Sequence, residues 1–142
     1  MQATYLNEGP LSPGYISGLL AETGSTRPSG AVALFIGRVR NDVTDGKEVT
    51  GIDYSAYEAM VGPVVEAIRE ELFTRFPDLN GIEIQHSTGF VASGEISLAV
   101  VVSSGHRREA FAALEACVEA IKERLPVWKK ELFSDGSSRW IH

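Results

Sequence analysis

Residues 95–125, EISLAVVVSSGHRREAFAALEACVEAIKERL, decide the fold. The first part, Glu95–Ser103, is apolar and rich in β-branched valine, which predicts a strand at the centre of a sheet. After Ser104-Gly105, apolar residues recur at spacings of three and four, which predicts a long helix that ends before Pro126. The stripe of this helix expected to face the core is Phe111, Leu114, Val118, Ile121 and Leu125.

Similar patterns predict further elements on both sides of this stretch. The expected order is a short helix at Ser12–Leu20, strands at Ala31–Gly37 and Val49–Tyr57, a helix at Ala59–Phe76, strands at Ile82–His86 and Glu95–Ser103, the helix after Gly105, and strands at Val127–Phe133 and Arg139–Ile141. The first strand is apolar throughout, so we expect it to be buried on both faces. Loops are expected at residues 23–30 and in the turn-rich segment before Glu95. This order predicts an α+β fold, a sandwich of a mixed sheet and two main helices.

A second apolar stripe is expected on the helix at Ala59–Phe76. Its members recur every four residues and are Met60, Val64, Ile68, Leu72 and Phe76, with Val65 and Phe73 widening the stripe. Pro63 is tolerable only near the first turn of this helix, and Pro77 ends it.

Length and composition are those of one globular domain, which we expect to span residues 1–142. The chain is 44% hydrophobic and 23% charged, and a domain of this size needs neither a disulfide nor a metal for stability. The single cysteine, Cys117, lies in a helical pattern and is expected to be a small buried side chain rather than a nucleophile. Residues 1–20 lack the pattern of a signal peptide, and no run approaches the roughly 18 apolar residues of a membrane span. We therefore expect a cytoplasmic protein.

The charge distribution indicates a localised anionic ligand. A net charge of −6 argues against a general nucleic-acid binder. Of the 13 lysines and arginines, seven follow Gly105: Arg107, Arg108, Lys122, Arg124, Lys129, Lys130 and Arg139. Such a basic cluster suits a small anion. The alternative is a scatter of solvated charges paired with the many glutamates.

Two short basic segments are candidate anion sites. His106 and Arg107 stand between a buried strand and the start of a helix, where free backbone N–H groups and the helix dipole favour an anion. Arg38 and Arg40 share a face if their strand persists, and would then form a fork for a phosphate or carboxylate. An edge strand protected by charge remains an alternative for the second pair.

Lys122 and Lys129 form a third candidate site. Lys122 lies in the last turns of a helix and Lys129 lies just past Pro126, which bends the chain, so the two amines can converge on one pocket. Two close ammonium groups lower each other's pKa, and partial burial against Trp128 would lower it further. A lysine tuned in this way can act as an acid, a base or a nucleophile near neutral pH. The alternative is a lysine favoured by the helix dipole and a strand lysine that faces water.

Three segments, GAVALFIGRVRND (30–42), SSGHRREAF (103–111) and IKERLPVWKKE (121–131), resemble the large, catalytic subunit of molybdopterin synthase, the MoaE family. The resemblance runs from about Gly30 to Trp140. It implies an α/β-hammerhead-type fold with a small antiparallel β subdomain. It also implies a sulfurtransferase that converts cyclic pyranopterin monophosphate into the dithiolene molybdopterin. The sulfur would come from the C-terminal Gly-Gly thiocarboxylate of a small ubiquitin-like carrier, bound at each end of a homodimer to give a heterotetramer. No cofactor or metal is implied for this subunit.

The resemblance also assigns site residues. Lys122 and Lys129 match the active-site lysines of the family, with Lys122 expected as the main acid/base residue and Lys129 as the group that orients substrate and stabilises charge. The residues that match contacts to substrate are Phe35, Arg40, His106 and Arg107.

Two departures from the family pattern affect this transfer. Arg38 stands where lysine is common, and the chain stops at His142 where relatives often have a longer tail, so that Arg139 is a candidate substitute for a basic residue of the tail. Two other functions stay open: a scaffold of the same fold that has lost catalysis, and a dimer that binds another phosphorylated metabolite. Only a synthase needs a groove for an extended Gly-Gly tail.

Overall fold

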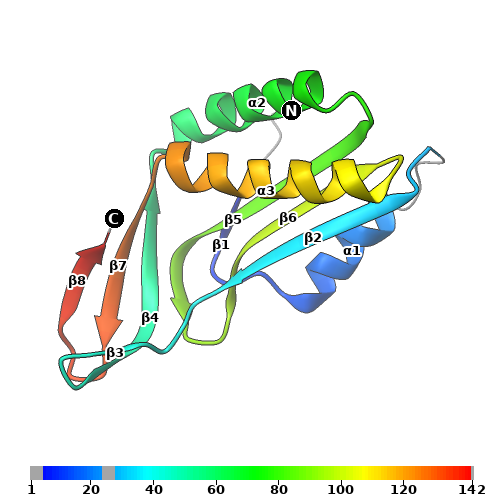
Figure 1. The fold of residues 1–142 in the computed structure, drawn as a ribbon. Helices are drawn as coiled ribbons and strands as arrows, with labels where there is room; N and C mark the ends of the chain where they lie inside the picture. The colour runs from blue at the N-terminus through cyan, green and yellow to red at the C-terminus, as the bar shows by residue number, and fades with distance from the viewer. Residues whose placement is uncertain (1–4, 24–27, 142) are drawn as a thin grey trace.

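The computed structural model describes residues 5–23 and 28–141 and contains three helices and eight strands within them (Figure 1). In chain order these are β1 (Leu6–Glu8), α1 (Pro13–Thr23), β2 (Ala31–Arg38), β3 (Val43–Thr44), β4 (Lys47–Ala56), α2 (Glu58–Arg75), β5 (Leu79–Ala92), β6 (Ile96–Ser104), α3 (Arg107–Arg124), β7 (Val127–Phe133) and β8 (Ser138–Ile141). Every predicted helix and strand is present, and β1 and β3 were not predicted. The predicted loop at 23–30 lies partly outside the described residues.

The strands form one mixed sheet in the order β2-β6-β5-β4-β7-β8, with β1 paired to β5 and β3 paired to β4. The β1–β5 pair is parallel and the other pairs are antiparallel. β6 lies between β2 and β5, and all nine of its residues are buried, which confirms the prediction of a central strand. The α+β class is likewise confirmed.

Helices cover both faces of the β2-β6-β5 part of the sheet. α2 and α3 lie side by side on one face, and α1 lies on the other (Figure 1). The larger core fills the space under α2 and α3 and includes Val65 and Ile68 from α2, Cys117 from α3 and Val100 from β6. The smaller core joins α1 to the opposite face through Ile16, Leu19 and Val101, among others. No helix in the described part of the chain is long and apolar enough to cross a bilayer.

The strands β4, β7 and β8 extend beyond the helices as a small antiparallel subdomain (Figure 1). β5 belongs to both parts, because its C-terminal residues pair with β4 from Gly51↔Ala92 to Tyr54↔Gly89. The predicted loop between His86 and Glu95 is therefore wrong for residues 87–92. Residues 89–92 gain ladder hydrogen bonds from β4, a partner that the local pattern does not reveal.

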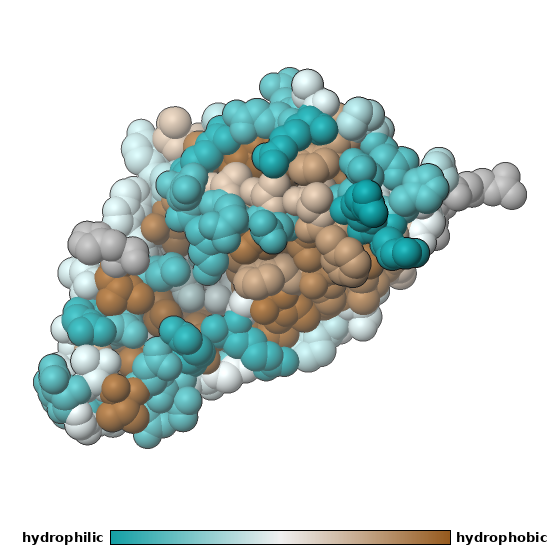
Figure 2. Space-filling model, viewed as in Figure 1, coloured by the Kyte–Doolittle hydropathy of each residue, from teal (hydrophilic) through white to brown (hydrophobic). Residues whose placement is uncertain are grey.

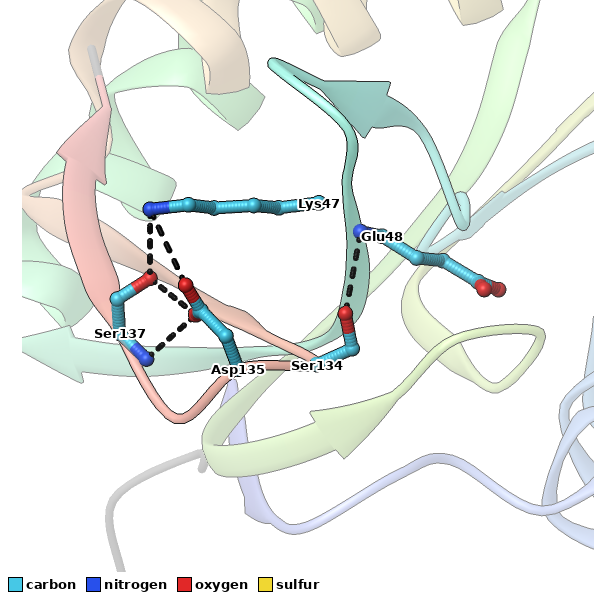
Figure 3. A network of polar contacts seen from close by, with 5 residues as sticks. All are labelled: Lys47, Glu48, Ser134, Asp135 and Ser137. Atoms are coloured by element: carbon cyan, nitrogen blue, oxygen red, sulfur yellow. Dashed lines mark hydrogen bonds and ion pairs between the residues drawn. The ribbon is translucent and has the colours of Figure 1, made fainter.

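A polar network holds the far end of the subdomain together (Figure 3). The Lys47 ammonium nitrogen lies 3.2 Å from Asp135 Oδ2 and donates to Ser137 Oγ at 3.4 Å. Asp135 Oδ1 accepts hydrogen bonds from the backbone N–H and the hydroxyl of Ser137, and these bonds lower the pKa of its carboxyl to about 2. The backbone N–H of Glu48 donates to Ser134 Oγ at 3.3 Å. The start of β4 is thus tied to the β7–β8 turn.

Both helix stripes are confirmed only in part: Ile121 on α3 and Val65, Ile68 and Leu72 on α2 are buried as predicted, whereas several other members are exposed or half-buried. On α3 the buried residues are Ala110, Ala113, Cys117 and Ile121, while Phe111 is 67% exposed. On α2 they are Val61, Val65, Ile68 and Leu72, while Met60 is exposed. The helices approach the sheet mainly through small or β-branched residues. A prediction based on the spacing of large apolar residues does not select such positions. Pro63 lies in the second turn of α2 rather than the first.

The prediction that residues 31–37 are buried on both faces is also wrong. β2 is an edge strand of the sheet, paired only with β6 among the described strands. Val32 is 44% exposed, and Ala33 is the only buried residue in the range 31–37.

Candidate active site

A pocket of about 280 Å³ lies where the end of β2 meets α3 and the β4-β7 pair. Its basic side chains are Arg38 and Arg40 from β2 and the residues after it, Lys122 from α3 and Lys129 from β7. The structure therefore brings the two predicted lysines together with both arginines of the GRVRN segment. The bulge at Gly37/Arg38 ends the regular strand before Arg40, so a persisting strand is not what brings the arginines together.

Pro126 makes the lysines converge. The residue before a proline disfavours helical backbone, and Leu125 is extended with φ −69° and ψ 127°. Its N–H still donates to Ile121 O at 3.0 Å, and the Val127 N–H donates to Leu125 O at 2.8 Å. This compact turn sends β7 back along β4, so that Lys129 returns to the level of Lys122.

Burial and charge both act on Lys129. Burial lowers the pKa of its amine, and the charge of Lys122 lowers it further. The predicted burial against Trp128 is wrong, because neighbouring strand residues point to opposite faces and Trp128 is 50% exposed. Lys129 instead pairs across the ladder with Tyr54, a buried residue of the pocket wall.

The sequence prediction missed His86, which lies in the wall of the same pocket. It is 7% exposed, and its Nδ1 lies 2.7 Å from the carbonyl oxygen of Ser87. Its ring meets that of Tyr54 edge-on with centroids 5.1 Å apart, and the Tyr54 hydroxyl donates to Ser97 Oγ at 3.0 Å. Burial lowers the pKa of His86 to about 4, and the charges of Lys129 and Lys122 contribute. A strand pattern indicates whether such a histidine is buried, but not which helix end faces it.

Two carboxylates of the pocket are each bound by an arginine. Glu131 is 8% exposed, and its Oε1 accepts hydrogen bonds from Arg139 Nε at 3.2 Å and Nη2 at 2.7 Å. Asp42 Oδ2 lies 3.3 Å from Arg40 Nη2 at the exposed rim. Arg139 is therefore engaged through the pocket wall rather than directed at a ligand.

His106 and Arg107 lie in a different place. They line a second pocket of about 500 Å³ together with Gly30, Ala31, Gly105 and Arg108. The His106 backbone N–H donates to Asp78 Oδ2 at 2.9 Å, and its Nδ1 lies 3.1 Å from the same oxygen. Arg107 begins α3 and Lys122 lies in its last turn, so about 22 Å of helix separates them. One chain does not bring the two basic clusters together.

Phe35 lies close to the lysine pocket without lining it. It is half-buried on β2 and packs against the larger core. Its ring lies beside Gly37, which lines the lysine pocket, but Phe35 is not itself a lining residue. Among the described residues, no group of three or more His, Cys, Asp or Glu side chains is placed to hold a metal ion.

Comparison with known proteins identifies the family. A family model described as MoaE protein matches residues 6–124. A molybdopterin synthase catalytic subunit from Nostoc sp. is 41% identical over 113 residues, which cover 80% of this chain and 68% of that protein. The crystal structure of molybdopterin synthase from Staphylococcus aureus has a TM-score of 0.86 and 30% identity, covering 100% of this chain and 98% of that one. A chain in the complex of subunits 1 and 2 of the Helicobacter pylori molybdopterin-converting factor has the same fold, with a TM-score of 0.78 and 23% identity over 96% of this chain and 87% of that one. The chain therefore belongs to the MoaE protein family, with the fold and the paired lysines described above.

Proposed function

We propose that this chain is the catalytic subunit of a molybdopterin synthase, acting as a single domain over residues 1–142. It transfers sulfur from the C-terminal thiocarboxylate of a small carrier protein to cyclic pyranopterin monophosphate, forming the dithiolene of molybdopterin. The observation that carries this proposal is the convergence of Lys122 and Lys129 in one pocket with Arg38 and Arg40.

The lysine pair suits the chemistry of this transfer. Attack of the thiocarboxylate on the pyranopterin side chain develops negative charge and requires proton transfers, which preorganised cations support. Lys129 is half-buried beside Lys122, and burial and the charge of Lys122 lower its pKa. We assign Lys122, at the exposed side of the pocket, as the acid/base residue near the transferred sulfur. Lys129 then orients substrate and stabilises charge.

Arg40 is the first candidate for binding the substrate phosphate. Its side chain is 83% exposed at the rim and is paired only with Asp42 among the described residues, so a phosphate can replace that exposed carboxylate. Phe35, beside Gly37, is proposed as an aromatic side chain next to the pterin.

His106 and Arg107 would join this site from a second copy of the chain. They lie at the other end of α3 from the lysines, so both clusters can serve one substrate only across a dimer interface. Figure 2 shows a hydrophobic area over β2 and the adjacent part of α3. Val32 of β2 and Phe111 of α3 are both exposed. This area and the edge of β2 are the proposed homodimer contact, since a large exposed apolar patch marks an interaction site.

The proposed partner is a small ubiquitin-like carrier with a C-terminal Gly-Gly thiocarboxylate. The Helicobacter pylori protein of the same fold is a complex of two different subunits. A pocket of about 280 Å³ favours a narrow chain end without side chains. Two carriers on a homodimer give a heterotetramer. We place the reaction in the cytoplasm, because a free, buried cysteine suits a reducing compartment.

A single-turnover assay tests this function. Purified protein is mixed with thiocarboxylated carrier and cyclic pyranopterin monophosphate, and molybdopterin is followed through its fluorescent oxidation product. We expect product with the wild type and a loss of at least about a hundredfold in rate with Lys122→Ala. Lys130→Ala is the matched control, since Lys130 lies on β7 outside the pocket, over the Trp140 ring. Wild-type rates in Lys122→Ala would exclude the assigned role, and carrier binding without product in the wild type would indicate a scaffold.

A further inference from the structure

His86 lies in the wall of the lysine pocket, yet the mechanism proposed above gives it no part. It comes from β5, which carries none of the site residues predicted from sequence. A buried imidazole beside two lysines calls for a physical reason, because burial and both positive charges disfavour its protonated form.

The orientation of the ring is fixed. A carbonyl oxygen only accepts hydrogen bonds, so the 2.7 Å contact between Nδ1 and Ser87 O places a proton on Nδ1. The edge-on contact with Tyr54 holds the plane of the ring. Because the buried ring is neutral near pH 7, Nε2 carries a lone pair and acts as an acceptor.

Lys129 is the donor that we consider for this lone pair. Tyr54, which contacts the imidazole, stands directly opposite Lys129 in the β4–β7 ladder. Of the two lysine charges that act on His86, that of Lys129 has the larger effect. Within residues 5–23 and 28–141, the contact with Ser87 is the only hydrogen bond of the ring.

Both carboxylates of the pocket are already engaged. The titratable and charged side chains that face it come from five elements and the segment after β2, and are Arg38, Arg40, Asp42, Tyr54, His86, Lys122, Lys129 and Glu131. In the described structure Glu131 is bound by Arg139 and Asp42 by Arg40, and the Tyr54 hydroxyl donates to Ser97. Unlike the two carboxylates, the imidazole Nε2 is an acceptor that is not already paired with a cation.

We propose that His86 is a positioning residue whose Nε2, open in the described structure, accepts a hydrogen bond from the Lys129 ammonium group once that side chain turns toward it, and so holds the amine toward the substrate. Its effect on sulfur transfer rests on the proposed function, whereas the turn of Lys129 onto Nε2 takes place in the free protein.

Two variants separate this role from a structural one. In His86→Asn the amide can still donate to Ser87 O from the Nδ1 position but does not reach the Nε2 position. In His86→Gln the amide oxygen reaches the Nε2 position, while the donor to Ser87 O is lost. A positioning role predicts that the asparagine variant is impaired and the glutamine variant is rescued. A purely structural role predicts the reverse order.

The first readout is the titration of the Lys129 amine in free protein labelled with ¹³C-lysine, with its signal assigned through Lys129→Arg. Loss of an acceptor destabilises the charged amine, so Lys129 should titrate at lower pH in His86→Asn and close to the wild type in His86→Gln. In the sulfur-transfer assay, we expect kcat to fall about tenfold in His86→Asn with little change in KM. An unchanged Lys129 titration in His86→Asn would overturn the proposal.

A third measurement needs no variant. The ¹⁵N spectrum of His86 in the wild type should show a protonated Nδ1 and an unprotonated Nε2, and a protonated Nε2 would overturn the proposal even if His86→Asn did not fold. If the wild type transfers no sulfur, the proposed function fails, and the lysine titration still decides the role of His86.

Discussion

His86 links the active-site pocket to the acid stability of the protein. Its pKa in the folded chain is about 4, against 6.5 for an unperturbed imidazole, mainly because the ring is buried. Between these values the unfolded chain binds a proton that the folded chain does not bind, so the free energy of unfolding decreases as the pH falls through this window. Above pH 6.5 the imidazole is neutral in both states and makes no such contribution.

We therefore expect the wild type to lose up to about 3 kcal/mol of stability between pH 6.5 and pH 4 through this one residue. Urea unfolding at several pH values, for the wild type and for His86→Asn, measures the effect as the difference between the two curves. Parallel pH dependences in the two proteins would show that His86 is not held neutral.

The sequence predicts the positions of some pocket residues but not of others. Lys122 and Lys129 were predicted to converge because Pro126 imposes a local bend between them, and local geometry follows from local sequence. His86 was not predicted, since its function depends on α3 and β7, which lie far along the chain. The role given to Trp128 was wrong because strand alternation directs it away from Lys129.

At the scale of elements, α3 is the structural link between the two basic clusters. Three of its four buried residues are small, and one of these, Ala113, is fully buried against the larger core. Any side chain that pushes α3 away from the sheet also moves Lys122 relative to Lys129.

We expect Ala113→Leu to destabilise the protein by about 2 kcal/mol, because the added atoms overfill a close contact. Ala112→Leu is the matched control, since Ala112 is an exposed neighbour on the same helix and leucine is a good helix former. Urea unfolding of both variants gives the free energies. Equal stability of the two would show that α3 is not seated as described.

The elements themselves were predictable where their apolar pattern is strong, as in α2, α3 and β6. β1 was missed because its three residues, Leu6–Glu8, carry no pattern and pair only with a distant strand, β5. The C-terminal part of β5 was missed for the same reason, because its partner β4 is supplied by tertiary structure.

For the whole molecule, the separation of the two basic clusters has a direct consequence for activity. If each active site combines Lys122 of one chain with His106 and Arg107 of the other, two different inactive variants can complement each other. A mixed dimer of Lys122→Ala and His106→Ala has one site with both substitutions and one site with neither.

Mixing equal amounts of these variants under conditions that allow subunit exchange should restore about one quarter of the wild-type activity, since about half of the dimers are mixed and half of their sites are intact. The sulfur-transfer assay measures the recovery, with each variant alone as the control. No recovery after exchange would show that the two clusters do not serve one substrate across the dimer.

The arrangement of the whole molecule was predicted as an α+β sandwich, because two amphipathic helices and an apolar strand set have few other ways to bury their faces. The edge position of β2 was not predicted. An apolar strand has the same pattern whether a second sheet layer, a helix or another copy of the chain covers it.

Cys117 shows a further consequence of the close contact between α3 and the sheet. Its side chain is fully buried, and burial raises the pKa of its thiol to about 12. An enzyme that receives a reactive thiocarboxylate is exposed to side reactions in which its own thiol captures the acyl group or forms mixed disulfides. Because thiolate is the reactive form, the only thiol in this sequence is inert toward that donor and toward oxidants. The fold thus keeps its own thiol unreactive while the enzyme transfers sulfur from another protein.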